Sequence, residues 1–214
     1  MPIPILHIGD KNYSSWSMRA WLALKHGGIQ FKEAQHDLPE LGGKPSFGAF
    51  SPNARVPALE IGRVTIAESL AICEWAAEQK PAVWPKDKTM RALARSAAAI
   101  MHAGFASLRN DAPFNVRRRT DASRMTPDGL SDAQQIDELW CEWLKLSGGP
   151  FLFSEWSIAD AMYAPVVTRF ITYGIPRSPE AEGYINRTVA EPHTAAWIAA
   201  AMKETRQLAR TDNA

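Results

Sequence analysis

The sequence predicts an α/β domain with the element order βαβ-ββα, followed by an all-α domain. Short apolar segments typical of strands are confined to the first 80 of its 214 residues. From residue 89 onward, apolar side chains recur at the spacing of helices that bury one face. Two prolines lie between these regions. We therefore expect domains at residues 1–80 and 89–214, joined by a linker at 81–88.

The composition is that of an ordinary globular chain. Hydrophobic residues make up 46% and charged residues 22%, which argues against a disordered or collagen-like protein. The formal net charge is only +1, so no overall field attracts nucleic acid or an anionic membrane. No stretch approaches the roughly 18 apolar residues of a membrane span, and the start of the chain lacks the features of a secretory leader. We expect a cytoplasmic protein without nucleic-acid or membrane partners.

The two cysteines exclude several kinds of site. Cys73 and Cys141 are far apart, and neither belongs to a C-x-x-C pair. This spacing excludes a cysteine zinc site and gives no disulfide framework, so we expect no metal cofactor. Cys73 lies on the same predicted helix face as Ser69, where a buried structural thiol is expected rather than a redox centre. A disulfide oxidoreductase would need a cysteine near the first helix and is disfavoured.

The first three predicted elements form a βαβ unit. Residues 3–8 are rich in Ile and Leu and suit a buried strand. A helix follows from Ser14, with apolar residues at helical spacing, and it stops at Gly27-Gly28, where a helix C-cap places glycine. Ile29 and Phe31 then alternate with polar neighbours as in a second short strand. A parallel pairing of the two strands, with a right-handed crossover, is the expected topology.

The next three elements form a hairpin and a helix. Residues 56–61 and 64–66 have strand character and flank Gly62-Arg63, where glycine in the first position favours a type II′ turn. These strands are therefore expected to be antiparallel. Pro57 lacks an amide donor and suits the first residue of its strand. Residues 69–78 show the periodicity of a helix that ends before the next proline.

The second half of the chain is expected to be helical. Trp84 lies between the two linker prolines and is expected to be exposed. Ser131 with Gln134, and Ser157 with Asp160, have the spacing of capping boxes that start helices. Apolar periodicity predicts helices at 90–108, at 131–147, from 157 onward and at 192–207.

Four motifs carry a resemblance to a known family. In chain order they are Ser14-Ser15-Trp16-Ser17-Met18-Arg19, Ser51-Pro52-Asn53-Ala54-Arg55-Val56-Pro57-Ala58-Leu59, Ala67-Glu68-Ser69-Leu70-Ala71-Ile72 and Ser157-Ile158-Ala159-Asp160. In this order and spacing they resemble the motifs of cytosolic glutathione S-transferases, and the serine region is similar to that of the zeta and tau classes. The resemblance covers essentially the whole chain. It implies a thioredoxin-like N-terminal domain, glutathione as cosubstrate, a homodimer, and an electrophile site between the domains.

Ser14 is the candidate catalytic residue. Glutathione has a thiol pKa near 8.5, so catalysis requires stabilisation of the thiolate. A hydroxyl at the amino end of the first helix can donate to the sulfur, and the helix terminus adds to this effect. Ser15 is the fallback, Tyr13 is a further candidate, and an N-cap serine without a catalytic role is the structural alternative. Ser15 also stands where many relatives have proline.

The resemblance also implies a glutathione-binding set. The Glu68-Ser69 pair, at a strand-to-helix turn, would hold the γ-glutamyl end of glutathione, although a plain helix cap is the alternative. The Val56-Pro57 bond is cis in the family, which turns the valine main chain toward the ligand. Lys44 or Arg55 could neutralise the glycine carboxylate, and each could equally be a solvated loop charge.

The electrophile pocket is assigned to the long predicted helix. His102, Phe105 and Arg109 lie within two turns of one another and could face the cleft between the domains. Core packing of Phe105 and surface exposure of Arg109 are the alternatives. The basic run Arg117-Arg118-Arg119 is expected to be a solvated loop.

The resulting hypothesis is a glutathione transferase that adds the thiolate to a small electrophile. A glutathione-dependent isomerase or peroxidase would start from the same thiolate and is the first alternative. One serine-type class of the family isomerises maleylacetoacetate. A non-catalytic glutathione-binding or regulatory protein of the same fold is the second alternative.

Overall fold

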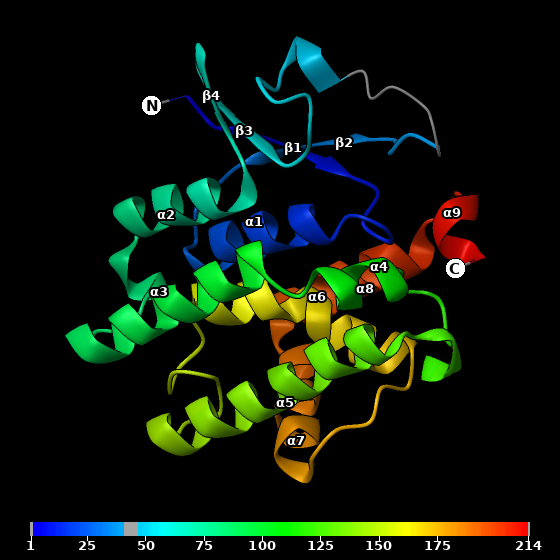
Figure 1. Cartoon of the computed structure of the whole chain (residues 1–214). Helices are drawn as coiled ribbons and strands as arrows, with labels where there is room; N and C mark the ends of the chain where they lie inside the picture. The colour runs from blue at the N-terminus through cyan, green and yellow to red at the C-terminus, as the bar shows by residue number, and fades with distance from the viewer. Residues whose placement is uncertain (1, 41–46, 214) are drawn as a thin grey trace.

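The protein consists of a small sheet layer resting on a larger helical part (Figure 1). The structure is a computed structural model in which residues 2–40 and 47–213 are described. The strands are β1 (Ile5–Gly9), β2 (Lys32–His36), β3 (Ala58–Ile61) and β4 (Val64–Ala67). They form a mixed sheet in the order β2-β1-β3-β4. All four lie in the first part of the chain, as the sequence predicted.

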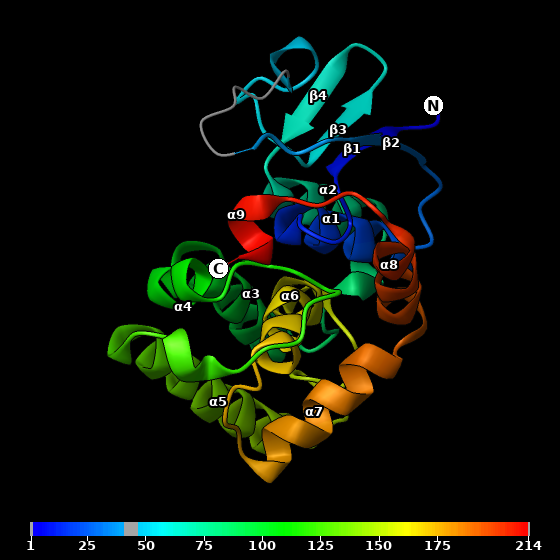
Figure 2. The same ribbon diagram turned by 90° about the vertical axis from the view of Figure 1, so that its right-hand side faces the viewer.

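Helices account for most of the remaining described chain. They are α1 (Ser15–His26), α2 (Ser69–Gln79), α3 (Lys88–Ala103), α4 (Ala106–Asp111), α5 (Pro127–Ser147), α6 (Ile158–Thr172), α7 (Pro179–Ala190), α8 (Pro192–Lys203) and α9 (Ala209–Asp212). Short 3₁₀ helices lie at Phe47–Ala49, Pro81–Val83 and Ala122–Arg124. Helices α1 and α2 cover one face of the sheet, and the other helices lie beyond them (Figures 1 and 2). This is the predicted thioredoxin-like domain followed by a helical one.

The βαβ unit has the predicted topology, but its second strand is shifted. Strands β1 and β2 pair in parallel, with Ile5 opposite Lys32 and Gly9 opposite His36. The prediction that Ile29 and Phe31 form this strand is wrong, because these side chains pack against the core from the connection before it. Strand β2 lies at the edge of the sheet, where one side of a strand meets solvent, so it does not need an apolar run.

The hairpin agrees with the sequence. Strands β3 and β4 are antiparallel, with Ile61 opposite Val64 across the turn. Gly62 has a φ of 63°, whereas Arg63 is not among the residues with positive φ, as a type II′ turn requires. Pro57 directly precedes β3, and the Val56-Pro57 peptide bond is cis. The pairing of β3 with β1 places this segment beside the start of α1.

The predicted long helix at 90–108 is in fact two helices. Helix α3 ends at Ala103, and α4 starts at Ala106. Gly104 is extended, with a φ of −95°, and Phe105 has a left-handed φ of 58°. The Phe105 side chain is buried in the core after this break. The apolar residues keep a helical spacing from α3 into α4, so periodicity alone did not reveal the break.

Other helix boundaries also differ from the prediction. Helix α5 begins at Pro127, capped by the Thr126 hydroxyl, so the capping box at Ser131 and Gln134 is wrong. Helix α7 was not predicted, although Ser178 before a proline is a typical N-terminal signal. The last predicted helix, 192–207, ends at Lys203 and a short α9 follows.

Two expectations of exposure are also wrong. Trp84 is only 3% exposed, because its side chain belongs to the hydrophobic core. Arg117 and Arg118 are half-buried and bind the C-terminal segment: Arg117 donates to the carbonyl of Arg206 at 2.6 Å, and Arg118 donates to the carbonyl of Thr211 at 3.0 Å. Contacts between segments far apart in the sequence leave no signal in the local sequence pattern.

None of the helices in the described part of the chain combines the length and the apolar character that a membrane crossing requires.

Helix α6 is the centre of the helical part. Every one of its residues except Ile171 is buried, and it packs against α1, α3 and α7. Its start is the predicted capping box: the Ser157 amide donates to the Asp160 carboxylate at 2.8 Å, and the Ser157 hydroxyl accepts from the Ala159 amide. Burial raises the pKa of Asp160 to about 6 despite these hydrogen bonds. The carboxyl also accepts from the Leu152 amide and the Tyr184 hydroxyl, so it joins three segments.

Replacing Asp160 with alanine should therefore destabilise the fold without affecting ligand binding. The substitution leaves the buried Leu152 and Ser157 amides without their acceptor, which should lower the free energy of unfolding by at least about 1 kcal/mol. Urea unfolding of the wild type and Asp160→Ala would measure this loss. A glutathione titration of the folded variant is the control. A fully stable variant that no longer binds glutathione would contradict a purely structural role.

Candidate functional site

The cavity that contains Ser14 and several of the other predicted site residues is lined by residues from both parts of the protein. Its volume is about 710 Å³. It is bounded by the start of α1, the segment before β3, helix α4, the buried helix α6 and the C-terminal segment. The lining residues are Tyr13, Ser14, Ser15, Trp16, Leu38, Pro39, Phe47, Ala54, Arg55, Val56, Arg109, Asn110, Pro113, Phe114, Arg169 and Thr211. Both halves of the chain therefore contribute to one site.

Ser14 lies at the amino end of α1 and faces this cavity. Its hydroxyl caps the helix by accepting from the Ser17 amide at 3.4 Å. The Ser14 and Ser17 hydroxyls are 2.7 Å apart, and the Ser17 hydroxyl also accepts from the Gly9 amide at 3.1 Å. The cap is thus present, but it leaves the Ser14 oxygen on the cavity wall. The first turn of α1 has no acidic residue to offset the positive end of its dipole.

The two alternatives to Ser14 are placed differently. Ser15 also lines the cavity as the first residue of α1. The Tyr13 hydroxyl donates to the Asp212 carboxylate at 2.9 Å and accepts from the Leu208 amide at 3.1 Å. Burial and the Asp212 carboxylate raise the Tyr13 pKa above its ordinary value. Tyr13 therefore attaches the C-terminal segment to the cavity, and its proton is already engaged.

Arg109 and Arg169 line the cavity, and the buried Arg19 lies next to the cavity residue Trp16. The Arg19 guanidinium lies 4.3 Å and the Arg109 guanidinium 5.6 Å from the centre of the Trp16 ring. Arg19 is fully buried, and burial followed by Arg169 and Arg109 lowers its pKa to about 9. Its Nε and Nη1 atoms have no hydrogen-bond partner among the described residues. This arrangement is electrostatically suited to an anion.

Arg169 is a cavity residue that the sequence analysis missed. It is 4% exposed, and its Nε donates to the Ala112 carbonyl at 2.8 Å. Burial lowers its pKa to about 10. An arginine near the end of the largely apolar helix α6 was a usable signal, because a buried charge needs a specific reason. Trp16, Asn110 and Phe114 also line the cavity without having been predicted to do so.

Glu68 and Ser69 lie beside the cavity rather than on its wall. Glu68 has a φ of 91° and caps α2 by accepting from the Leu70 amide at 3.1 Å. The fully buried Ser69 hydroxyl donates to the same carboxylate at 3.3 Å. Across the domain boundary, His102 Nε2 is 3.4 Å from Glu68 Oε2, and its ring contacts the edge of Trp16 at 5.4 Å. His102 thus connects the predicted γ-glutamyl site to the cavity wall.

The other predicted residues separate into three groups. Arg55 and Val56 line the cavity, and Pro57 is buried behind them. Arg109 also lines it, whereas Phe105 is packed in the hydrophobic core. Lys44 lies outside the described residues.

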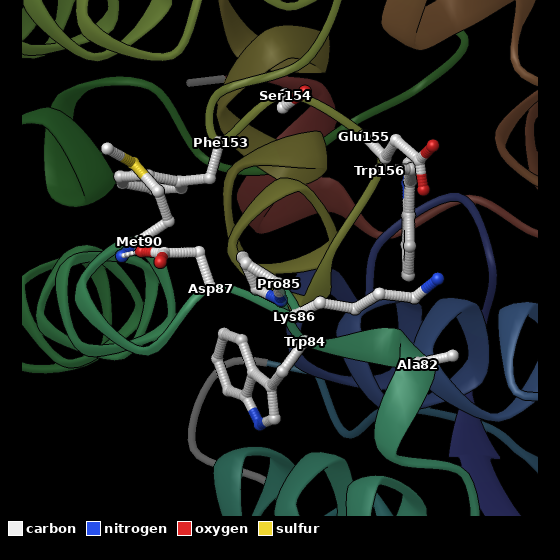
Figure 3. Close-up of a pocket in the computed structure, with 10 residues that line it drawn as sticks. All are labelled: Ala82, Trp84, Pro85, Lys86, Asp87, Met90, Phe153, Ser154, Glu155 and Trp156. Atoms are coloured by element: carbon white, nitrogen blue, oxygen red, sulfur yellow. Dashed lines mark hydrogen bonds between the residues drawn. The ribbon is translucent and has the colours of Figure 1, made fainter.

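A second cavity lies at the linker (Figure 3). Its volume is about 400 Å³, and it is lined by the linker residues around Trp84 and by the segment that leads into α6, including Trp156. None of the residues that line it also lines the cavity at Ser14. Figure 3 shows the Lys86 side chain extending toward Trp156, and no predicted catalytic residue lines this cavity.

Comparisons with known proteins agree with this architecture. A profile of the glutathione S-transferase N-terminal domain matches residues 13–79. Maleylacetoacetate isomerase from Mus musculus is 35% identical over 186 residues, which cover 82% of this chain and 82% of the mouse protein. The chain belongs to the glutathione S-transferase family. The Rattus norvegicus maleylacetoacetate isomerase is 28% identical over 189 residues and has the same coverage of both chains.

The solved structures include glutathione transferases with a similar fold. A glutathione transferase homologue from Burkholderia gl BGR1, with bound glutathione, has a TM-score of 0.70 and 26% identity. The match covers 92% of this chain and 97% of that one. The similarity therefore extends over both the sheet part and the helical part of this chain.

Neither cysteine of this family member lines the cavity, and Cys73 is buried as predicted. Cys73 is fully buried, and its thiol lies 3.8 Å from the carbonyl of Arg19. Burial raises the pKa of the Cys73 thiol far above its usual range. Cys141 is half-buried on α5, where its sulfur lies 3.1 Å from the Ser178 hydroxyl.

We predict that Cys73 does not react with an alkylating reagent in the native protein. The thiolate is the reactive form, and here it is both inaccessible and disfavoured. Mass spectrometry of iodoacetamide-treated Cys141→Ser would show no modification until the protein is unfolded in guanidinium. Rapid modification of the folded variant would mean that α2 opens or that the thiol is accessible.

Proposed function

We propose that this transferase-family protein is a glutathione-dependent isomerase of small carboxylic acids with a cis double bond between two carbonyl groups. The observation that carries the proposal is that Ser14, at the positive end of α1, shares one cavity with Arg109 and Arg169. A thiolate and a carboxylate substrate both carry negative charge. Ser14 and the end of α1 can stabilise the thiolate, and the two arginines can stabilise the carboxylate. The related isomerases are named for maleylacetoacetate, which is a substrate of this chemical class.

Glutathione binds with its sulfur against Ser14. In the structure the Ser14 hydroxyl donates to the Ser17 hydroxyl at 2.7 Å. When glutathione binds, the Ser14 hydroxyl turns and donates to the sulfur instead. A hydrogen bond to a charged group contributes about 1.5 to 3 kcal/mol, and the helix terminus about 0.3 to 1 kcal/mol. These contributions lower the thiol pKa by about one to three units, since one unit corresponds to about 1.4 kcal/mol.

The thiolate then catalyses isomerisation by reversible addition. The sulfur forms a bond to one carbon of the double bond, and the displaced π electrons move onto the conjugated carbonyl to give an enolate. The former double bond is now single and rotates. The enolate electrons restore the double bond in the trans geometry while the carbon–sulfur bond breaks. Glutathione leaves as the same thiolate, so no electrons or atoms are consumed.

The arginines hold the substrate and stabilise the enolate. Arg109 is half-buried and lines the cavity, so its guanidinium can donate hydrogen bonds to a carboxylate that enters from solvent. Arg169 already donates to the Ala112 carbonyl and contributes its charge from the cavity floor. Trp16 lines the same cavity, and its ring lies close to the guanidinium groups of both Arg109 and the buried Arg19. A partly enclosed cavity strengthens each of these electrostatic interactions.

The central test is a pH titration of the thiolate absorbance of bound glutathione. Its pKa should lie about one to three units below that of free glutathione in the wild type. It should return toward the free value in Ser14→Ala, because the hydrogen bond to the sulfur is lost. Ser15→Ala is the matched control, since Ser15 lines the same cavity one residue further along.

The outcomes distinguish the alternatives. A lowered pKa that survives Ser14→Ala but not Ser15→Ala would assign the role to Ser15. Failure of the wild type to bind glutathione at millimolar concentration would favour a non-catalytic protein of this fold.

The substrate assignment is tested with Arg109→Gln in an assay that follows isomerisation of maleylacetoacetate. Loss of a charged hydrogen bond should raise the KM for this substrate by about ten- to a hundredfold, with little change in the KM for glutathione. Arg55→Gln is the control, because Arg55 is proposed to bind the glycine carboxylate of glutathione, so that the KM for glutathione should rise instead. If Arg109→Gln raised only the KM for glutathione, Arg109 would belong to the glutathione site.

Conjugation of glutathione to an electrophile is the second candidate. It begins with the same thiolate, but its adduct is released instead of eliminating glutathione. Glutathione consumption separates the reactions, because isomerisation leaves the glutathione concentration unchanged.

A further inference from the structure

Two histidines and a glutamate meet where the C-terminal end of α1 contacts the start of α8. His26 is the last residue of α1. Glu191 is the N-cap of α8, and His193 lies in the first turn of that helix. One ligand atom from each of the three side chains lies within 4.8 Å of the others. We propose that these residues form a zinc site that joins the two domains, separate from the cavity at Ser14.

The atoms in this cluster are of the right kind for zinc. Imidazole nitrogen and carboxylate oxygen are both ordinary zinc ligands. With zinc–ligand bonds of about 2.0 to 2.2 Å, neighbouring ligand atoms of a tetrahedral ion lie about 3.3 Å apart. His26 Nε2 and Glu191 Oε1 are 3.1 Å apart. The ligand atom of the half-buried His193 lies within 4.8 Å of the other two, so zinc binding requires this side chain to move closer to them.

The contact between His26 and Glu191 is not satisfied as a hydrogen bond. His26 Nε2 is buried, and among the described residues it has no hydrogen-bond partner, although the Glu191 oxygen is only 3.1 Å away. A short separation without hydrogen-bond alignment is what two ligands of a common ion show. An ordinary ion pair between a protonated His26 and Glu191 is the competing explanation.

The surroundings hold the ligands in place. The His26 ring stacks on Trp156, with ring centres 3.3 Å apart and an angle of 11°. Trp156 is also one of the residues around the linker cavity in Figure 3. Glu191 Oε2 accepts from the Thr194 amide and hydroxyl, while Oε1 accepts from the His193 amide at 3.0 Å and lies 3.1 Å from His26 Nε2. The His26 and His193 rings are nearly perpendicular, at 81°. Three protein ligands leave a position for water.

The consequence of zinc binding is a link between domains. His26 belongs to the sheet domain, whereas Glu191 and His193 belong to the helical part. A ligand that binds only the folded protein raises its melting temperature. Zinc should therefore stabilise the folded chain without entering the reaction at Ser14.

The test is calorimetric titration of zinc chloride into the full chain, without an affinity tag, glutathione or other thiols. All proteins carry Cys141→Ser, so that no partly exposed thiol competes for zinc. We expect one zinc ion per chain and a higher melting temperature with zinc. His26→Gln and His193→Gln should each weaken binding at least tenfold and abolish the thermal shift. His36→Gln is the matched control, because His36 Nε2 lies 3.0 Å from His7 Nδ1 in a second histidine pair.

Several results would overturn the proposal. Binding that is unchanged in both His26→Gln and His193→Gln would leave only an ion pair at this junction. Binding lost only in His36→Gln would move the site to the sheet. Equal binding of magnesium would indicate an unspecific cation effect, because magnesium prefers all-oxygen sites. Circular dichroism of the zinc-free variants verifies folding, and if His26→Gln is misfolded, His193→Gln alone decides.

Discussion

The burial of helix α1 on all sides is the constraint on which the rest of the structure depends. Residues 17–24 are buried without interruption, because the helix is packed between the sheet and helices α2, α6 and α8. A surface helix would expose one face, and its ends would meet water. Here the first turn must be capped within the protein, and Ser14 provides the cap. The same packing fixes the Ser14 oxygen and the positive end of the helix on the cavity wall.

The buried helix also brings positive charge into the protein. Arg19 is carried into the interior by α1, where it meets Arg169 from α6 and Arg109 from α4. Its main favourable contact is with the ring of Trp16, and part of its guanidinium lacks hydrogen bonds among the described residues. Such a cluster opposes folding when it is empty of anions and is relieved when an anion binds. The arginine cluster therefore lowers the free energy of unfolding, and a bound anion would restore part of it.

The C-terminal segment returns to the sheet domain and contributes to the cavity wall. Glu204 accepts from the Lys11 and Asn12 amides at 2.8 and 2.9 Å. Arg206 pairs with the buried carboxylate of Asp10 at 2.7 Å. Beyond them, Thr211 in α9 completes the wall, and Figures 1 and 2 both show α9 beside α4. The domains are thus held together by polar contacts around the site in addition to the apolar contact between α1 and α6.

The sequence by itself determined the features that depend on neighbouring residues. The hairpin at Gly62, the capping box of Ser157 with Asp160 and the start of α1 at Ser14 are set by local hydrogen bonds and backbone preferences. Only the tertiary structure decided the break at Gly104, the burial of Trp84, the place of Arg169 in the cavity and the meeting of His26 with His193. Periodicity identifies which face of a helix is apolar, but not which partner covers it. Those outcomes depend on contacts between residues far apart in the chain, whose geometry is fixed only when the helices pack against one another.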